Sequence, residues 1–197
     1  MDPVIVVGAG PVGLALALAL TRYDVPVVVL DEGSGQYDAR PARTTVLRPD
    51  TADFVDRICR TPVSGAGIRW SAWRMMRRRQ LLRRQETGDP SPVHLAQHVL
   101  ARRLRAALGD ESLARIATDC RLGSLEQHPD GITAHTREPQ ARPAEPGGGA
   151  RWRGSHLVGC DGARSTVRKL LDVRFPGRTA VERHAVAALR AELPWPG

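Results

Sequence analysis

The 197-residue sequence predicts an α/β protein that begins with two parallel strands joined by a helix. Val4–Val7 is a short apolar run rich in β-branched residues, which is typical of a fully buried strand. Leu14–Leu20 alternates leucine and alanine, which are both strong helix formers. Val27–Leu30 is a second buried run, and Asp31 follows it directly. Strand, helix and strand thus follow one another within about 30 residues, as in a βαβ unit.

Three glycines join the first strand to the helix in the spacing G-x-G-x-x-G. In such a turn Gly8 permits a sharp bend, Gly10 lets a pyrophosphate approach the backbone, and Gly13 lets the helix pack closely on the sheet. Asp31 comes 18 residues after Gly13, where a carboxylate can accept hydrogen bonds from an adenosine ribose. The pattern predicts a Rossmann-like dinucleotide site at the positive end of the helix dipole. The alternative is a glycine-rich turn that binds nothing.

The composition is strongly basic, with a formal net charge of +8 and an isoelectric point near 10.8. Lys169 is the only lysine, so 28 of the 29 basic residues are arginine. Together with abundant alanine, glycine and proline, this skew indicates the codon bias of a GC-rich genome more than a nucleic-acid-binding surface. We therefore expect no nucleic-acid partner.

Cysteine usage and the N-terminus bear on the cellular compartment. Cys59, Cys120 and Cys160 are odd in number and widely spaced, so they fit neither a disulfide framework nor a metal cluster. The N-terminus lacks the basic region of a signal peptide, and the leucine–alanine run is too short and too rich in alanine to span a bilayer. We expect a cytoplasmic protein with no metal and no membrane association.

After the second strand, the sequence predicts a loop at Glu32–Ala42 and a helix from about Asp50 to Arg60. Arg43 lies between them. On its own, an arginine in such a position is best interpreted as a solvated surface charge.

Residues 61–92 combine chain-breaking residues with a dense run of arginines. One interpretation is a strip that contacts phosphate groups. The other is the solvated face of a strand or helix with apolar side chains packed beneath it, which the lack of aromatics within the basic run favours. The apolar side chains expected beneath are Trp70, Trp73, Met75, Leu81 and Leu82.

The middle of the chain predicts a helix followed by an inserted β-hairpin or meander. Apolar residues recur at helical spacing over Val93–Leu108. Ile116–Glu126 and Ile132–Thr136 are expected to be strands, with Pro129-Asp-Gly as the turn between them. Glu138–Ala150 is rich in proline, glycine and alanine and is expected to form a mobile hairpin loop.

A second informative stretch lies near the C-terminus. We expect His156–Gly159 to end a strand, Asp161-Gly162 to form a turn, and Ser165 to cap a helix. The plain alternative is an ordinary Asp-Gly turn between a strand and a helix. Ala185–Leu193 is expected to be one further strand.

Three motifs resemble those of the flavoprotein aromatic hydroxylases of the para-hydroxybenzoate hydroxylase type, which are single-component FAD-dependent monooxygenases. They are similar to the family's glycine-rich FAD motif, its arginine segment and its Asp-Gly motif, and here they are Val6–Leu14, Ala42–Thr45 and Gly159–Arg168. Asp-Gly before Arg-Ser-x-Val-Arg is far more specific than a bare Asp-Gly. The resemblance runs from Pro3 to about Gly177 and is weak at residues 61–92 and 138–150.

The resemblance implies an FAD site built from residues that match the family's motifs, namely Gly8, Gly10, Gly13, Asp31, Arg43, Gln97, Cys120, Asp161, Gly162 and Arg164. By resemblance, the glycines cradle the pyrophosphate and Asp31 holds the adenosine ribose. Arg43 reaches the phosphate or ribityl region of the flavin, and Gln97 lies near the ribityl chain. Cys120 is implied to lie on a strand that passes the adenine, where backbone contact suffices. Asp161 bonds the ribose and diphosphate region, with Gly162 and Arg164 in its turn.

The resemblance also implies an activity. In relatives NAD(P)H reduces the flavin, molecular oxygen adds to give a C4a-hydroperoxide, and its distal oxygen attacks an electron-rich aromatic ring. The implied substrate is a small phenolic or polyketide-like aromatic molecule, and no catalytic side chain is implied because the chemistry belongs to the flavin. The alternatives are a related flavoprotein reductase or halogenase, or a flavin-binding remnant without catalysis. The oligomeric state is left open.

The same resemblance implies a domain organisation. Residues 1–175 are expected to form the FAD-binding domain, with 61–92 reaching toward the substrate, and 176–197 to begin the sheet of a second, substrate-binding domain. The family's third FAD motif, a Gly-Asp followed by alanine and histidine, is not found in these 197 residues. We therefore expect the N-terminal part of a hydroxylase, with weakened FAD binding.

Overall fold

The computed structural model describes most of the chain, namely residues 1–35, 43–137, 149–178 and 181–182. The chain divides into two compact units. The described residues of the first unit lie in 1–35, 101–137 and 149–178, and those of the second in 43–100 and 181–182. The loop expected at residues 138–148, the strand expected at Ala185–Leu193 and part of the loop at 32–42 lie outside the described residues. The boundary expected at residue 175 stays a prediction.

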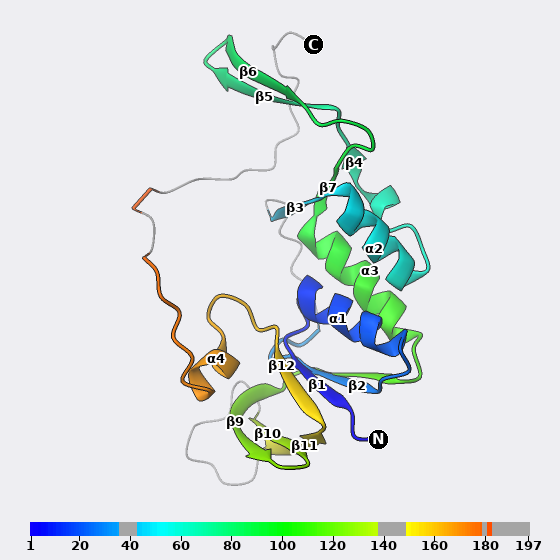
Figure 1. Ribbon diagram of the computed structural model, residues 1–197, viewed down its shortest axis with the longest axis vertical. Helices are drawn as coiled ribbons and strands as arrows, with labels where there is room; N and C mark the ends of the chain where they lie inside the picture. Colours follow the sequence, from blue (N-terminus) through cyan, green and yellow to red (C-terminus); the bar gives the residue numbers. More distant parts are fainter. Residues whose placement is uncertain (36–42, 138–148, 179–180, 183–197) are drawn as a thin grey trace. The chain divides into compact units, whose positions relative to one another are not determined.

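The first unit is organised around a parallel sheet with the strand order β12-β1-β2-β8 (Figure 1). Its four strands are β1 (Val4–Val7), β2 (Val27–Leu30), β8 (Ala114–Ala117) and β12 (His156–Gly159). Strand β1 pairs in parallel with both β2 and β12, and β2 pairs in parallel with β8. The predicted βαβ unit and the Rossmann-like fold class are thereby confirmed.

Helix α1 (Pro11–Thr21) packs against β1, β2 and β8. Proline at the start of the helix costs no hydrogen bond, because the first N–H groups of a helix have no intrahelical partner. Leu14 and Leu18 are fully buried, and Ala17 between them allows close packing on the strands. The helix thus covers one face of the parallel sheet.

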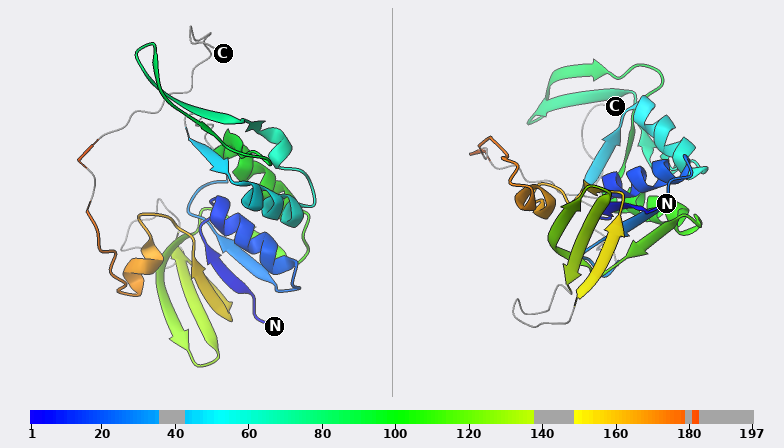
Figure 2. Two further views of the ribbon diagram at one scale, coloured as in Figure 1. Left: turned by 45° about the horizontal axis from the view of Figure 1, so that its top comes forward. Right: turned by 60° about the horizontal axis from the view of Figure 1, so that its bottom comes forward.

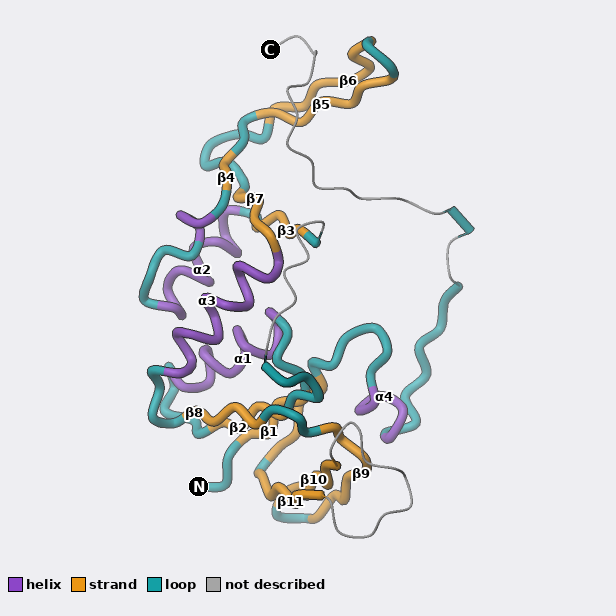
Figure 3. Tube along the Cα trace, turned by 180° about the vertical axis from the view of Figure 1, so that it is seen from behind, coloured by secondary structure: helices purple, strands orange, loops and turns teal. Residues whose placement is uncertain are grey.

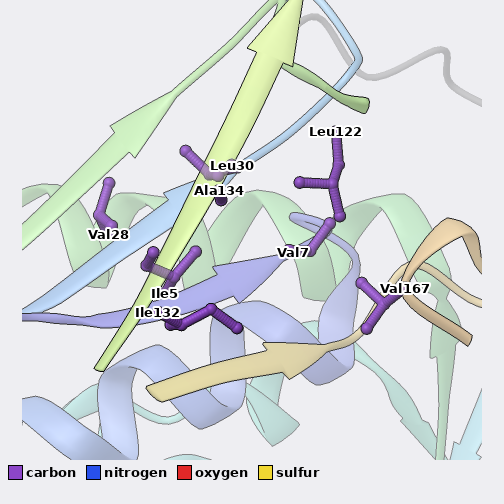
Figure 4. Packing of buried hydrophobic residues seen from close by; sticks show 8 residues of the cluster. All are labelled: Ile5, Val7, Val28, Leu30, Leu122, Ile132, Ala134 and Val167. Carbon is purple, nitrogen blue, oxygen red and sulfur yellow. The ribbon is translucent and has the colours of Figure 1, made fainter. Parts of the chain in front are cut away.

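A three-stranded antiparallel meander packs against the other face (Figure 2). Its strands are β9 (Arg121–His128), β10 (Gly131–Arg137) and β11 (Gly149–Gly154). Alternate residues of β1 and β2 meet residues of β9 and β10 and one residue of helix α4 (Thr166–Leu170) in a single cluster (Figure 4). This buried cluster consists of Ile5, Val7, Val28, Leu30, Leu122, Ile132, Ala134 and Val167. It holds the meander and the parallel sheet together through apolar burial.

The second unit contains a small antiparallel sheet of order β3-β7-β4 and a separate two-stranded hairpin (Figure 3). Its elements are β3 (Thr44–Leu47), α2 (Pro49–Cys59), the short 3₁₀ helix η1 (Ser64–Ala66), β4 (Ile68–Arg69), β5 (Ala72–Arg77), β6 (Gln80–Glu86) and β7 (Val93–Ala96). Asp56 of α2 accepts hydrogen bonds from the N–H groups of Val63 and Ser64 and from the Ser64 hydroxyl, so it fixes the chain that follows the helix.

Two sequence predictions about regular structure are wrong. Residues 93–96 form strand β7, and helix α3 (Gln97–Gly109) begins only after it. In β7 the buried Val93 and Leu95 alternate with the exposed His94, and pairing with β3 and β4 prevails over helical spacing.

The strand expected over Ile116–Glu126 is two strands that belong to different sheets. Strand β8 ends at Ala117 and β9 begins at Arg121. Asp119 between them has a φ of 54°, a left-handed conformation that interrupts a strand. The loop expected over 138–150 is also shorter at its end, because Gly149 and Ala150 belong to β11.

Of the five apolar side chains expected beneath the arginine run, Trp70 is half-buried and the other four are exposed. Trp73, Met75, Leu81 and Leu82 are between 43% and 51% exposed.

Among the described residues, no helix is long and apolar enough to cross a membrane.

We predict that Leu30→Ala lowers the free energy of unfolding by about 2–5 kcal/mol, because this fully buried side chain joins the sheet to the meander. Urea unfolding followed by circular dichroism measures the change. The control Val46→Ala, at a side chain that is 51% exposed, is expected to cost less than about 1 kcal/mol. Equal losses in the two variants would contradict the prediction.

Candidate functional site

The turn from β1 to α1 is built around Gly8. Its φ of 105° is one that residues with a side chain rarely adopt, and its N–H donates to the carbonyl oxygen of Leu30 at 2.7 Å. A Cβ atom on Gly8 would lie 2.6 Å from the carbonyl oxygen of Cys160 and 3.0 Å from the Cα of Asp161. The glycine therefore lets two turns that are about 150 residues apart in sequence lie against each other.

The other two glycines of the motif differ in their surroundings. A Cβ atom on Gly13 would overlap the carbonyl oxygen of Gly8, so the first turn of α1 requires a glycine there. A Cβ atom on Gly10 would meet no protein atom within 4 Å. Gly10 is also the N-cap of α1, and no side chain caps the helix there. The N-terminal end of α1 thus faces open space at Gly10, where an anion can accept hydrogen bonds from its N–H groups.

The turn from β12 to α4 carries the Asp-Gly motif. The N–H of Cys160 donates to the carbonyl oxygen of Val7 at 2.7 Å, which continues the pairing of β12 with β1. Asp161 Oδ2 accepts from the N–H groups of Thr166 and Val167 at 2.5 and 3.1 Å. Asp161 Oδ1 is buried and has no hydrogen-bond partner within the part of the chain that the structure describes. A buried carboxylate oxygen needs a donor, so this oxygen is placed to accept a hydrogen bond from a ligand or a water molecule.

The remaining residues of this turn set its shape. Gly162 has a φ of 81°, and its carbonyl oxygen accepts from the N–H of Ser165 at 3.1 Å. The Ser165 hydroxyl accepts from the N–H of Arg168 at 3.0 Å, which confirms the predicted helix cap. Arg164 lies exposed on the same turn.

Asp31 stands at the end of β2, facing the glycine turn. Its Oδ1 accepts from the N–H of Ala9 at 3.3 Å, and its carboxylate side chain is 23% exposed. Its backbone joins the next connection, because the Asp31 carbonyl oxygen accepts from the N–H of Cys120 at 2.8 Å. Cys120 itself lies between β8 and β9, not within a strand. The structure thus brings five of the predicted site residues or their turns together at the carboxyl ends of the parallel strands, namely Gly8, Gly10, Asp31, Cys120 and Asp161.

Arg105 is a residue of this site that sequence reasoning missed. Its Nη2 lies 3.8 Å from Oδ2 of Asp31, and its side chain is only 22% exposed. A Cβ atom on Gly35 would lie 3.1 Å from Arg105 Nη1, so the loop after β2 lies against the guanidinium. Helical spacing places Arg105 only on the polar side of α3, and no local pattern pairs it with a carboxylate that precedes it by 74 residues.

The second unit brings two other predicted site residues together. Strands β3 and β7 pair in register from Thr44 opposite Ala96 to Leu47 opposite Val93. The next bond beyond this ladder runs from the N–H of Gln97 to the carbonyl oxygen of Arg43 at 2.8 Å. Arg43 is exposed and Gln97 is half-buried. Two residues 54 positions apart are therefore neighbours at one end of a sheet, each with a polar side chain.

Burial changes the pKa of two thiols next to these turns. Burial raises the pKa of Cys160 above its ordinary value, and the negative charge of Asp161 raises it further. Burial also raises the pKa of Cys120, which a hydrogen bond from Thr136 partly offsets. Both thiols are thus held in the neutral form at neutral pH. The described residues contain no group of three or more histidine, cysteine or acidic side chains that could hold a metal ion.

Together these features suit one class of ligand. Open space at a helix N-terminus suits a phosphate, while the Asp31 carboxylate and the buried Asp161 oxygen suit hydroxyl donors. A nucleotide that carries a pyrophosphate and ribose hydroxyls offers both. The residues present therefore fit a dinucleotide cofactor.

Comparison with known families and proteins agrees with this geometry. Residues 1–196 match the family model described as "FAD binding domain". The chain is 29% identical to a flavin-dependent monooxygenase of Mycobacteroides abscessus, over 96% of this chain and 41% of the relative. It is 30% identical to para-nitrophenol 4-monooxygenase of Pseudomonas sp., over 93% of this chain and 45% of the relative. The chain thus spans less than half the length of these relatives.

Among solved structures, the chain is similar to p-nitrophenol 4-monooxygenase PnpA from Pseudomonas putida DLL-E4. The TM-score is 0.79 at 27% identity, and the match covers 91% of this chain and 46% of that one. The α/β fold predicted from the sequence is the fold of this enzyme's matching part.

We predict that Gly13→Ala destabilises the protein by about 1–3 kcal/mol or more, since the new methyl group meets the backbone of Gly8. Gly10→Ala is expected to change stability by less than about 1 kcal/mol, because its methyl group enters open space. Thermal unfolding of the two variants against the wild type tests the pair. Similar melting temperatures for both variants would contradict the close packing of α1 on the Gly8 turn.

We also predict that iodoacetamide alkylates Cys160 more slowly at pH 8 in the folded protein than in the guanidinium-unfolded protein. The reagent attacks the thiolate, and a raised pKa lowers the thiolate fraction. The rate for Cys160, followed by peptide mass spectrometry, should keep rising at pH values where the unfolded control has reached its plateau. Coincident pH profiles would contradict the raised pKa.

Proposed function

Because the chain belongs to the family of FAD binding domains, we propose that it is the FAD-binding part of an NAD(P)H-dependent monooxygenase that hydroxylates a small aromatic substrate. The names of its relatives support this activity, since they are flavin-dependent and para-nitrophenol monooxygenases. On this proposal the further reactants are molecular oxygen and the aromatic molecule, and no nucleic acid takes part.

One observation carries the FAD assignment. The Gly8 turn lies against the Cys160–Asp161 turn, and Asp31 faces the first of them through the Ala9 N–H. The two motifs that resembled those of flavoprotein hydroxylases thus lie against each other, although Gly159, where the second motif begins, is 151 positions after Gly8. A buried Asp161 oxygen that has no hydrogen-bond partner among the described residues supports a ligand beside the glycine turn.

The adenosine and pyrophosphate half of FAD would be bound in the first unit. The pyrophosphate would occupy the open space at Gly10, between the N-terminus of α1 and the Asp161 turn. Asp31 would accept hydrogen bonds from the ribose hydroxyls, with Arg105 holding its second oxygen. The backbone at Cys120 is the proposed contact of the adenine.

The flavin half would be bound by residues for which the structure gives neighbours but no ligand contact. We propose that Arg43 binds the phosphate or ribityl region and that Gln97, hydrogen-bonded to the Arg43 backbone, lies along the ribityl chain. Asp161 Oδ1 would accept a hydrogen bond in the ribose and diphosphate region of FAD, and Gly162 and Arg164 would support its turn.

A bound flavin would supply the redox chemistry of the proposed hydroxylation, with NAD(P)H as the reductant. The residues of this chain would bind and orient the cofactor. Asp161 would act as a positioned acceptor. Its Oδ2 accepts hydrogen bonds from the first N–H groups of α4, which fixes the carboxylate so that Oδ1 would face the ligand. No proton transfer is assigned to a side chain of this chain.

We predict that Gly10→Val weakens FAD binding by about tenfold or more, because its side chain fills the space proposed for the pyrophosphate. Titration of the purified chain by quenching of FAD fluorescence measures the dissociation constant. Gly109→Val is the matched control, since Gly109 is also surrounded by open space but lies away from both turns. It should bind FAD as the wild type does.

The same purified chain distinguishes the monooxygenase proposal from a flavin-binding remnant and from a reductase. A yellow protein whose flavin is bleached by NADPH and reoxidised with oxygen consumption supports the monooxygenase proposal. A bound flavin that NADPH does not bleach favours a non-catalytic flavin-binding remnant, and bleaching that no aromatic compound accelerates favours a reductase. A colourless protein that takes up no added FAD would contradict the proposed site.

A further inference from the structure

Arg105 is a partly buried cation beside the carboxylate that we propose for the adenosine ribose. Asp31 and Arg105 belong to the same unit, although they are 74 positions apart in the sequence. Nη2 of Arg105 lies 3.8 Å from Oδ2 of Asp31, and the two side chains are 22% and 23% exposed. Solvent and salt screen partly buried charges less than they screen charges on the surface. The guanidinium therefore acts on Asp31 more strongly than a surface arginine would.

The guanidinium is also held by the loop that follows β2. A Cβ atom on Gly35 would lie 3.1 Å from Nη1 of Arg105, so the backbone of this loop packs against the guanidinium. The loop is joined in turn to the connection between β8 and β9, because the Gly33 carbonyl oxygen accepts from the N–H of Asp119 at 3.1 Å. A guanidinium has five N–H groups, so it can make further bonds and still keep its charge beside the Asp31 carboxylate.

The Asp31 carboxylate keeps acceptor capacity for a ligand. Its Oδ1 accepts from the N–H of Ala9 at 3.3 Å, and the 3.8 Å from Oδ2 to the guanidinium is longer than a hydrogen bond. A carboxylate has about four lone-pair sites, so two neighbouring ribose hydroxyls can still donate to it. Gly33 leaves room at the second oxygen, since a Cβ atom there would lie 3.3 Å from Oδ2.

Arg105 would also offset a repulsion within the proposed site. The pyrophosphate proposed at Gly10 is anionic, and the Asp31 carboxylate faces the same glycine turn through the Ala9 N–H. Two anions at one edge of the sheet repel each other, whereas a cation beside one of them reduces that repulsion. A site that has to hold both a pyrophosphate and a carboxylate therefore benefits from Arg105.

We propose that Arg105 is a positioning residue that sets the preference of the site for nucleotides with free ribose hydroxyls, by orienting the Asp31 carboxylate toward them and offsetting its charge. Arg105 acts here through the proposed FAD site, so the inference rests on the proposed function. The alternative is a role in folding alone, in which Arg105 only joins α3 to the loop after β2. That alternative implies an equal loss of affinity for ribose and deoxyribose nucleotides when Arg105 is replaced.

The test uses the 197-residue chain and compares ADP with 2′-deoxy-ADP, which differ by one ribose hydroxyl. Calorimetric titration of the wild type should give a dissociation constant about tenfold lower for ADP, as expected for one hydrogen bond to a charged group. In Arg105→Met this ratio should fall to about two or less. Asp31→Asn should lower the ratio as well, and adding Arg105→Met to it should change the ratio no further, because both residues act on the same hydroxyl.

Two further variants control for charge and for folding. Arg105→Lys keeps the charge and should give a higher ratio than Arg105→Met. Arg102→Met removes a charge from an exposed position of α3 and should leave both dissociation constants unchanged. Circular dichroism verifies the fold of each variant, and Arg105→Gln takes the place of Arg105→Met if the latter is unfolded.

The inference is overturned if the Arg105 variants weaken ADP and 2′-deoxy-ADP by the same factor. It is also overturned if the wild type does not distinguish the two nucleotides, or if Arg105→Lys distinguishes them no better than Arg105→Met. A wild-type chain that binds neither FAD nor ADP contradicts the proposed function as well. FAD binding together with a ratio that Arg105 does not affect contradicts the inference alone.

Discussion

The contact between two backbone turns, at Gly8 and at Cys160–Asp161, is the constraint on which the first unit depends. With no Cβ on Gly8, the carbonyl of Cys160 approaches to a distance that any side chain would prevent. The central strand β1 can then pair with β12 along its full length and continue into a bond from the Cys160 N–H to Val7. The sheet order and the meeting of both motifs follow from this approach.

The same contact between turns places the Asp161 carboxylate, which has both a structural role and an oxygen available to a ligand. One carboxylate oxygen holds the first N–H groups of α4, which fixes the orientation of the side chain. The other oxygen is left buried without a described partner, at a cost in desolvation that a bound hydroxyl or water would recover. Asp31 is held in a comparable way, between the Ala9 N–H and the Arg105 guanidinium. Both carboxylates are positioned before any ligand arrives, which lowers the entropic cost of binding.

The two units differ in how completely their large apolar side chains are buried. In the first unit α1 covers one face of the parallel sheet, and the meander covers the other face, where the cluster around Ile5 and Leu30 lies. In the second unit the hairpin of β5 and β6 leaves Trp73, Met75, Leu81 and Leu82 about half exposed, and no other described strand pairs with it. Surface charge favours solubility where apolar side chains are exposed, and residues 72–86 carry six arginines.

The sequence by itself determined the features that are local. The βαβ unit, helix α2, the β9–β10 turn and the Ser165 cap depend on residues within a few positions of one another, and all are found as predicted. It also named the glycines and Asp31, because a strand–glycine turn–helix–strand order brings the glycine turn and the end of the second strand to the same edge of the sheet. Only the tertiary structure decided that Val93–Ala96 is a strand, that β8 and β9 separate at Asp119, and that Arg105 meets Asp31. Each of these depends on pairing or contact between segments that are distant in sequence. The free energy of such contacts outweighs local propensity, and no periodic pattern in the sequence indicates them.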